Sequence, residues 1–128
     1  MKNAKVSLVV LLLLNPCFAW ADDNFDKGVS AFEKANYTDA LRYLNPLAEL
    51  GKARAQLFMG IMFAHGYGVK RDLKKAVGWY VKAAEQSDTK AQNNLAAMYA
   101  RGLGAKKIML NLFIGTAKLR KWVIARLK

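Results

Sequence analysis

The chain is poor in the residues on which many small catalytic or cross-linked proteins depend. Its 128 residues include one cysteine, one histidine and two prolines. A lone cysteine cannot form an intramolecular disulfide or a cysteine-rich metal site, so the fold has to be stabilised by packing alone. Acidic residues are also scarce, with 9 Asp and Glu against 21 Lys and Arg, which gives a net charge of +12.

Length and apolar content narrow the class of protein further. A chain of 128 residues has room for one small domain. Hydrophobic residues make up 54% of it, which excludes a disordered basic tail. A net charge of +12 would favour nucleic acid or a membrane surface as partner, if the charge belonged to the folded part.

Residues 1–21 have the layout of a secretory signal peptide. Lys2 and Lys5 precede a run over 6–14 that is apolar apart from Ser7, and residues 19–21 read Ala-Trp-Ala, which suits a signal peptidase. The run is shorter than the roughly 20 residues that span a bilayer. We therefore expect cleavage after residue 21, no stable membrane anchor thereafter, and a location in the bacterial periplasm or outside the cell.

Cleavage at this position would also remove the only cysteine. A lipid anchor on Cys17 is the competing interpretation, but the small residues of a lipoprotein signal are absent before it, where the chain has Asn15 and Pro16. The mature chain would then lack thiol chemistry altogether.

An internal repeat with a period of 36 residues predicts the architecture. Identical residues recur at this offset across helix-like segments and the glycine-rich connections between them. The matching pairs include Ala55/Ala91, Gln56/Gln92, Met62/Met98, Gly66/Gly102, Gly68/Gly104, Ala40/Ala76, Ala48/Ala84 and Glu49/Glu85.

Each repeat unit is predicted to be a pair of helices, because apolar residues recur at helical spacing and no segment alternates as a strand would. Gly66 is suited to end the first helix of the pair, and Asp72 to cap the second. The expected helices span 24–34, 38–50, 55–64, about 73–86 and about 90–100.

The residues of this pattern resemble a Sel1-like repeat, and residues 25–51 resemble the related tetratricopeptide repeat. The resemblance covers 25–107 and implies an all-α fold, an α/α solenoid of helix pairs that binds protein partners on a concave surface, without catalysis or cofactors. We expect a repeat domain over 22–107, in units of about 25–54, 55–90 and an incomplete 91–107. The motif residues are Ala55, Gln56, Gly60, Phe63, Gly66, Tyr67, Gly68, Val69, Asp72, Lys75, Ala76, Trp79, Tyr80 and residues 82–86, Lys-Ala-Ala-Glu-Gln.

The same resemblance implies which side chains would line the concave groove. In tetratricopeptide-like units the first helix of each pair faces the partner. Aligned on Gly60, the expected groove residues are Arg54, Leu57, Ile61, His65, Lys90, Asn93, Ala97 and Arg101.

Other candidate sites have simpler interpretations. His65 as a general base or metal ligand lacks a partner cysteine and stands where the next unit has Arg101, so a helix-end residue is favoured. Residues 66–68, Gly-Tyr-Gly, lack the third glycine and the preceding strand of a dinucleotide loop. Trp79 and Tyr80 are expected to pack between helices, and the basic residues of 70–75 to form a solvated face that could also meet an acidic partner.

Residues 108–128 depart from the repeat and form a tail without family character. One set of codons that encodes residues 107–128 also encodes the missing second helix when it is read in another frame. In that frame an Asp, a Trp-Tyr pair and a Lys-Ala-Ala-Glu segment each lie 36 places after their counterparts. We hypothesise a base lost at Lys106 or Lys107. Without that helix, Leu95, Met98 and Tyr99 would be partly uncovered unless the tail folds over them.

The charge divides as +2 in 1–21, +5 in 22–107 and +5 in 108–128. Because only the middle share belongs to the repeats, nucleic acid is not expected as a partner. Three functions stay open: an exported scaffold for an unidentified protein partner; a truncated remnant without function; and a β-lactamase-type hydrolase, the activity that the resemblance associates with some cysteine-rich Sel1-like proteins. This chain lacks their paired cysteines, so we expect no enzyme and no nitrocefin hydrolysis.

The frameshift hypothesis predicts a specific DNA sequence. Reading the gene beyond codon 128 should reveal further Ala-Gln and Gly-x-Gly units in the second frame, because the array would continue there. Downstream DNA that encodes no such unit in any frame would contradict the hypothesis.

Overall fold

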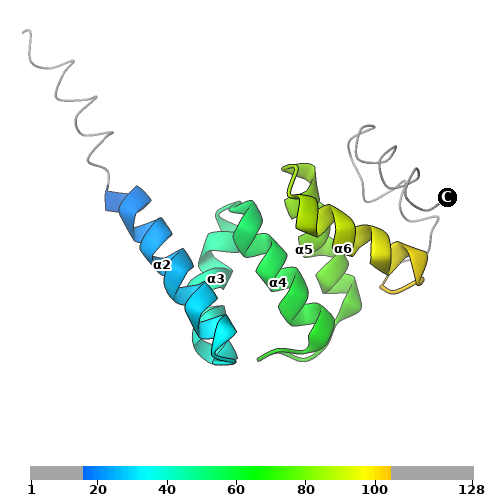
Figure 1. Cartoon of the computed structure of the whole chain (residues 1–128), viewed down its shortest axis with the longest axis horizontal. Helices are drawn as coiled ribbons and strands as arrows, with labels where there is room; N and C mark the ends of the chain where they lie inside the picture. Colours follow the sequence, from blue (N-terminus) through cyan, green and yellow to red (C-terminus); the bar gives the residue numbers. More distant parts are fainter. Residues whose placement is uncertain (1–15, 105–128) are drawn as a thin grey trace, which may run out of the picture.

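The computed structural model describes residues 16–104, and the regular structure in this range is entirely helical (Figure 1). The expected all-α class is therefore confirmed. Predictions that fall on 1–15 and on 108–128 lie outside the described residues. The helices are α2 (Pro16–Glu33), α3 (Tyr37–Glu49), α4 (Ala53–His65), α5 (Leu73–Glu85) and α6 (Thr89–Ala100).

The helices form two layers, as expected of an α/α solenoid. In Figure 1, α3 and α5 pass behind α2, α4 and α6. Helix α2 packs on α3 and α4 on α5 within the pairs, while α3 against α4 and α5 against α6 join one pair to the next. Each helix therefore contacts its neighbours along the chain, which is the arrangement of stacked repeats.

Side-chain caps and a left-handed glycine set the helix ends. The carboxylate of Asp72 accepts a hydrogen bond from the Lys75 amide at 3.0 Å, as predicted, and Asp88 does the same for Ala91 at 2.9 Å. At the end of α4, Gly66 has a φ of 75° and donates its amide to the Met62 carbonyl. A positive φ favours glycine, so the predicted helix stop is confirmed.

Helix α2 begins earlier than predicted. The expected start at residue 24 is wrong, since the helix already includes Pro16. The added turns bring Ala21, 6% exposed, into the core.

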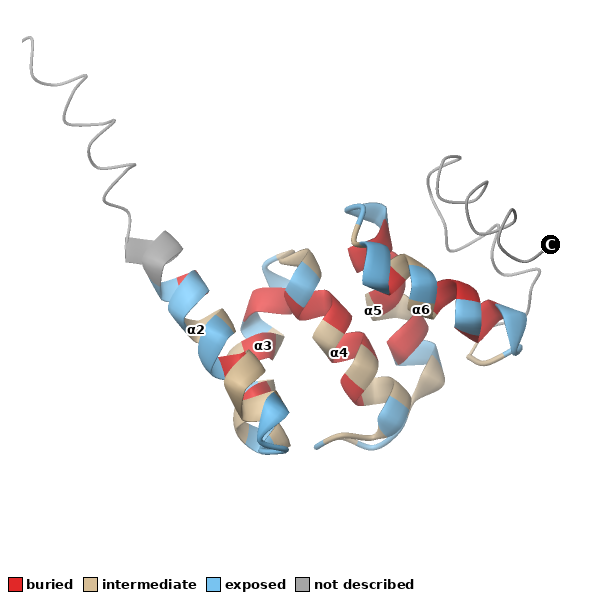
Figure 2. Cartoon of the chain, in the orientation of Figure 1, coloured by how far each residue is buried: buried red, intermediate tan, exposed pale blue. Residues whose placement is uncertain are grey.

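Two hydrophobic clusters form the core, and α4 contributes to both (Figure 2). Met59 and Met62 belong to the cluster shared with α2 and α3, which includes Leu44 and Leu47. Leu57 belongs to the cluster shared with α5 and α6. Because its side chains are needed on both sides, α4 is apolar around most of its circumference.

Leu95, Met98 and Tyr99 of the third unit are all buried. The prediction that they would be uncovered unless residues 108–128 fold over them depends on residues outside the described range. The three side chains belong to one cluster with Val77 and Tyr80 of α5. Helix α6 thus buries its apolar face against the second helix of the preceding unit.

A side-chain hydrogen bond recurs with the period of the sequence. The Gln56 amide Nε2 donates to the Ala48 carbonyl at 3.1 Å, and Gln92 donates to the Ala84 carbonyl at 3.2 Å. The donor and the acceptor of the second bond each lie 36 residues after the donor and the acceptor of the first. Each bond joins the first turn of one unit to the last turn of the helix before it.

Helices α4 and α5 approach closely at Gly60. A Cβ atom built on Gly60 would lie 2.5 Å from carbons of the Tyr80 ring, which is itself 3% exposed. Gly78 of α5 offers a contrast, because a Cβ atom there would meet no atom within 4 Å. The two glycines therefore have different roles although both lie inside helices.

We predict opposite effects of alanine at these two positions. Gly60→Ala should destabilise the protein by about 1–3 kcal/mol, because the methyl group displaces the buried ring. Gly78→Ala should stabilise it by about 0.5–1 kcal/mol through backbone entropy alone. Urea unfolding followed by circular dichroism measures both, and a Gly60→Ala variant as stable as the parent would contradict the packing argument.

Candidate partner-binding site

A cavity of about 440 Å³ opens where α4, α5 and α6 meet. Its wall combines apolar side chains with several polar and basic ones, drawn from three helices and from the segments that follow α4 and α6. The lining residues are Ala64, His65, Arg71, Leu73, Tyr80, Asn94, Ala97, Met98, Arg101 and Leu103.

The structure brings some of the expected groove residues together. His65, Ala97 and Arg101 all line this cavity. They belong to equivalent parts of successive units. His65 and Arg101 are separated by the 36 residues of the repeat period.

The other expected groove residues lie elsewhere. Arg54, Lys90 and Asn93 are exposed near the starts of α4 and α6, away from the cavity lining. Ile61 is half-buried against the core, and Leu57 is only 3% exposed. Leu57 therefore does not line a surface. The expectation assumed that one side of α4 is exposed, whereas α4 packs against neighbouring helices on both sides.

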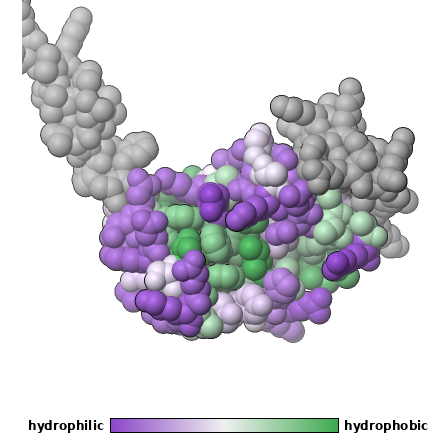
Figure 3. Space-filling view, in the orientation of Figure 1, coloured by the Kyte–Doolittle hydropathy of each residue, from purple (hydrophilic) through white to green (hydrophobic). Residues whose placement is uncertain are grey.

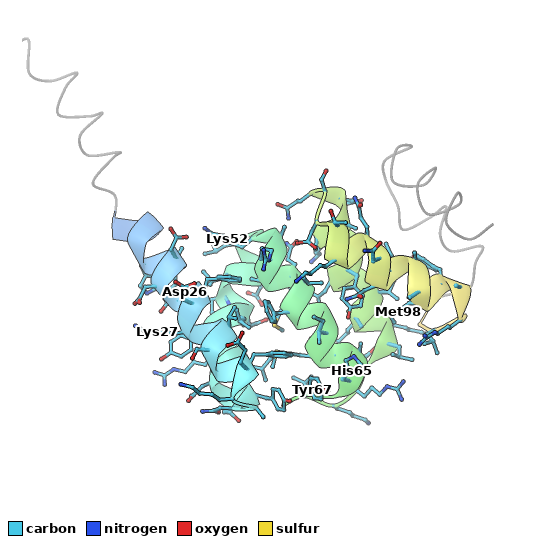
Figure 4. All side chains as sticks on the ribbon, viewed as in Figure 1. Asp26, Lys27, Lys52, His65, Tyr67 and Met98 are labelled. Atoms are coloured by element: carbon cyan, nitrogen blue, oxygen red, sulfur yellow. The ribbon has the colours of Figure 1, made fainter. Side chains whose placement is uncertain are left out.

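His65 is held at the cavity by a row of aromatic rings. Its ring stacks on that of Tyr67, with centroids 5.2 Å apart (Figure 4). The Tyr67 ring in turn stacks on that of Tyr37 at a centroid distance of 4.6 Å. Phe32 contacts Tyr67 edge-on, and Phe58 contacts Phe32 in the same way. The Gly-Tyr-Gly segment thus fixes the loop to the first helix pair.

Apolar side chains gather in the middle of the face that α2, α4 and α6 present (Figure 3). Hydrophilic residues border them, as at the rim of a protein-binding surface. Phe25, Phe32 and Phe58 are only partly buried and pack against the first hydrophobic cluster. The face of α2, α4 and α6 therefore offers apolar contact area.

Two arginines give the cavity its positive character. Arg71 donates its Nε–H to the Ala64 carbonyl at 3.0 Å, which fixes the guanidinium at the wall. Arg101 is exposed and caps the end of α6. Within the described range, neither arginine forms an ion pair, and no acidic side chain lines the cavity.

Tyr80 joins the cavity to the core. Burial raises the pKa of Tyr80 to about 12, and a hydrogen bond with Asn94 opposes part of that rise. The expectation that Tyr80 packs between helices is confirmed by its 3% exposure. Asn94 was not anticipated, since the repeat pattern gave no reason to single out one polar residue of α6.

Among the side chains that the structure describes, no three of His, Cys, Asp or Glu converge as metal ligands would. None of the described helices combines the length and the apolar character that a membrane crossing requires.

The sequence motif Ser-x-x-Lys, which occurs in β-lactamases, is found once, over residues 87–90. The structure places both of its ends on the surface: Ser87 has a φ of 67° in the turn before α6, and Lys90 is exposed in the first turn. Neither residue lines the cavity. The motif therefore falls in a turn and a helix cap rather than in a catalytic site.

The family model of the Sel1 repeat matches this chain three times in succession, over residues 17–52, 53–88 and 89–108. The chain belongs to the Sel1 repeat family. Proteins of this family generally mediate protein–protein interactions and are typically non-catalytic scaffolds. The first matched unit starts at the beginning of α2, earlier than the sequence pattern had indicated.

Similar proteins of known name cover a wide range of organisms. The chain is 33% identical over 91 residues to "Chitin synthase regulator SKT5" of Saccharomyces cerevisiae, which is 70% of this chain and 13% of that protein. It is 32% identical over 80 residues to "ERAD-associated E3 ubiquitin-protein ligase component HRD3A" of Arabidopsis thaliana, which is 62% of this chain and 12% of that protein. The chain thus spans a small part of these relatives.

A solved structure shares the architecture. The crystal structure of a Sel1 repeat protein from Oxalobacter formigenes superposes with a TM-score of 0.62 at 26% identity. The match covers 84% of this chain and 56% of that one. The Sel1 solenoid predicted from the sequence is therefore confirmed.

The two buried tyrosines should respond differently to loss of their hydroxyl groups. Tyr80→Phe removes the hydrogen bond with Asn94 and should destabilise the protein by about 1 kcal/mol at neutral pH. The Tyr99 hydroxyl is buried without a hydrogen-bond partner, so Tyr99→Phe should be neutral or stabilising.

The raised pKa of Tyr80 adds a pH signature. Its folded pKa of about 12 lies above the ordinary value of 10.0, so its stabilising contribution is complete below pH 10 and is lost as the pH rises toward 12. Urea unfolding at intervals from pH 9 to 12 should show a shallower decline for Tyr80→Phe than for the parent. An identical decline in both proteins would contradict this assignment.

Proposed function

We propose that this Sel1 repeat protein is an exported scaffold that holds a protein partner outside the cytoplasm. The observation that carries the proposal is the apolar surface on the face of α2, α4 and α6 (Figure 3), together with a cavity at the junction of two units that His65, Arg71 and Arg101 line. A partner could contact both regions at once. The family and the solenoid architecture support binding rather than catalysis.

The names of two relatives support the same proposal. One is described as a regulator of chitin synthase and the other as a component of a ubiquitin ligase. Both names describe proteins that act beside an enzyme. We propose by analogy that the partner of this chain is itself a folded protein whose activity or location the scaffold controls.

Export is proposed from the layout of residues 1–21. Because α2 begins at Pro16, cleavage after residue 21 would shorten this helix by six residues and remove Ala21 from the core. Phe25, Gly28 and Phe32 would still pack against the first cluster and α3. The mature chain is therefore expected to keep the first helix pair.

Cell fractionation tests export. A carboxy-terminally tagged chain expressed in a Gram-negative host should be recovered from the periplasm, with Asp22 as the first residue on amino-terminal sequencing. Recovery from the cytoplasm with residues 1–21 retained would refute export, although it would leave partner binding open.

Partner binding is tested by capture with matched variants. Arg54→Ala combined with Asn93→Ala should reduce several-fold the amount of one specific protein cross-linked in the host's periplasm, because both residues are exposed on the first-helix layer. The control is Arg42→Ala combined with Asn45→Ala, which makes the same changes on α3. Unchanged capture by the first variant, or equal loss in both, would refute this use of the surface.

A further inference from the structure

We propose that the cavity between α4, α5 and α6 binds a carboxylate side chain on an acidic segment of the partner protein. This inference rests on the proposed scaffold function and names the chemistry that the partner must present. It concerns His65, Arg71, Asn94 and Arg101, of which Arg71 and Asn94 were not among the expected groove residues.

The donors converge from separate elements. His65 ends α4, Arg71 lies in the connection to α5, and Arg101 follows α6. Asn94 adds a side-chain amide from the middle of α6. Because the backbone holds these positions on different helices, the cluster is built by the packing of two repeat units and not by local sequence alone.

Among the described residues, no carboxylate lines the cavity. Asp72, the neighbour of Arg71 in the sequence, directs its carboxylate to the start of α5, where it accepts a hydrogen bond from the Lys75 amide. Lys27 pairs with Asp23 and Lys52 with Asp22, and these ion pairs lie on the first helix pair or link it to α4. An acidic ligand would therefore supply the missing charge.

The Arg71 guanidinium is positioned to bind such a ligand. A guanidinium has five N–H donors, and the bond to the Ala64 carbonyl uses one of them. The remaining donors suit a carboxylate, which accepts two parallel bonds from one arginine. Fixing the guanidinium beforehand reduces the entropy that binding would otherwise cost.

The apolar part of the wall strengthens the interaction and limits its size. Leu73, Met98 and Leu103 line the same cavity, and charges attract more strongly beside apolar groups than in open water. A volume of about 440 Å³ accommodates one or two side chains of an extended segment. Residues 108–128 carry five basic and no acidic side chains, so their side chains do not provide the complementary charge.

Fluorescence anisotropy with defined peptides tests the proposal. The purified full chain is titrated into fluorescein-labelled hexaglutamate, with hexaglutamine and hexalysine as the other probes. We expect saturable binding of hexaglutamate alone. Arg101→Gln should weaken it about tenfold, the loss expected for one charge-assisted contact of about 1.4 kcal/mol.

Matched variants separate the cavity from general surface charge. Arg42→Gln removes one positive charge from exposed α3 and should change the affinity less than twofold. Arg71→Lys keeps the charge but loses the two-pronged donor, so it should weaken binding while the circular dichroism spectrum stays that of the parent. Should Arg71→Lys unfold the chain, Arg101→Gln against Arg42→Gln decides the question.

The outcomes are distinct from those of the capture experiment. Absence of saturable hexaglutamate binding, or equal losses for Arg42→Gln and Arg101→Gln, would overturn the carboxylate site even if a partner is captured. Hexaglutamate binding without any captured partner would instead refute the scaffold and leave the cavity chemistry standing.

Discussion

The close approach of α4 to α5 at Gly60 determines the geometry of the second and third repeats. The Tyr80 ring occupies the space that a side chain on residue 60 would fill. In that position its hydroxyl reaches Asn94 of α6. One glycine therefore sets the distance between two helices and, through one phenol, the position of the third. The cavity lies at the meeting point of these three helices, so its shape depends on the same contact.

Polar bonds complement this packing at the opposite end of the helices. Gln86 donates to the Gly51 carbonyl at 2.8 Å and to the Gln56 side chain at 2.9 Å, while Gln56 donates to Ala48. Gln56 is 4% exposed, so losing either partner would leave a buried amide unsatisfied. The network joins three successive helices at the boundary between the first and second units. Apolar packing thus provides the adhesion between units, and these directional bonds fix their register.

The period of 36 residues was sufficient to predict the helix pairs, the Asp72 cap and the left-handed Gly66, because each depends on local chemistry. It was not sufficient to predict that Leu57 is buried, since a period does not tell how many neighbours a helix has. The extent of α2 was misjudged for a related reason, because the spacing of residues does not show that Ala21 packs into the core. The role of Arg71 depended on a bond to Ala64, seven residues away across a loop whose course the sequence does not specify.

The charge of the chain illustrates the difference between composition and placement. A net charge of +12 indicates little about a partner when most of it lies in residues 1–21 and 108–128. Within the repeats, Asp72 and Asp88 accept hydrogen bonds at the starts of α5 and α6. Among the described residues, no acidic side chain lines the cavity, whereas Arg71 and Arg101 both do. A modest excess of basic residues thus becomes a localised one, because the packing of two repeat units brings these arginines to the same cavity.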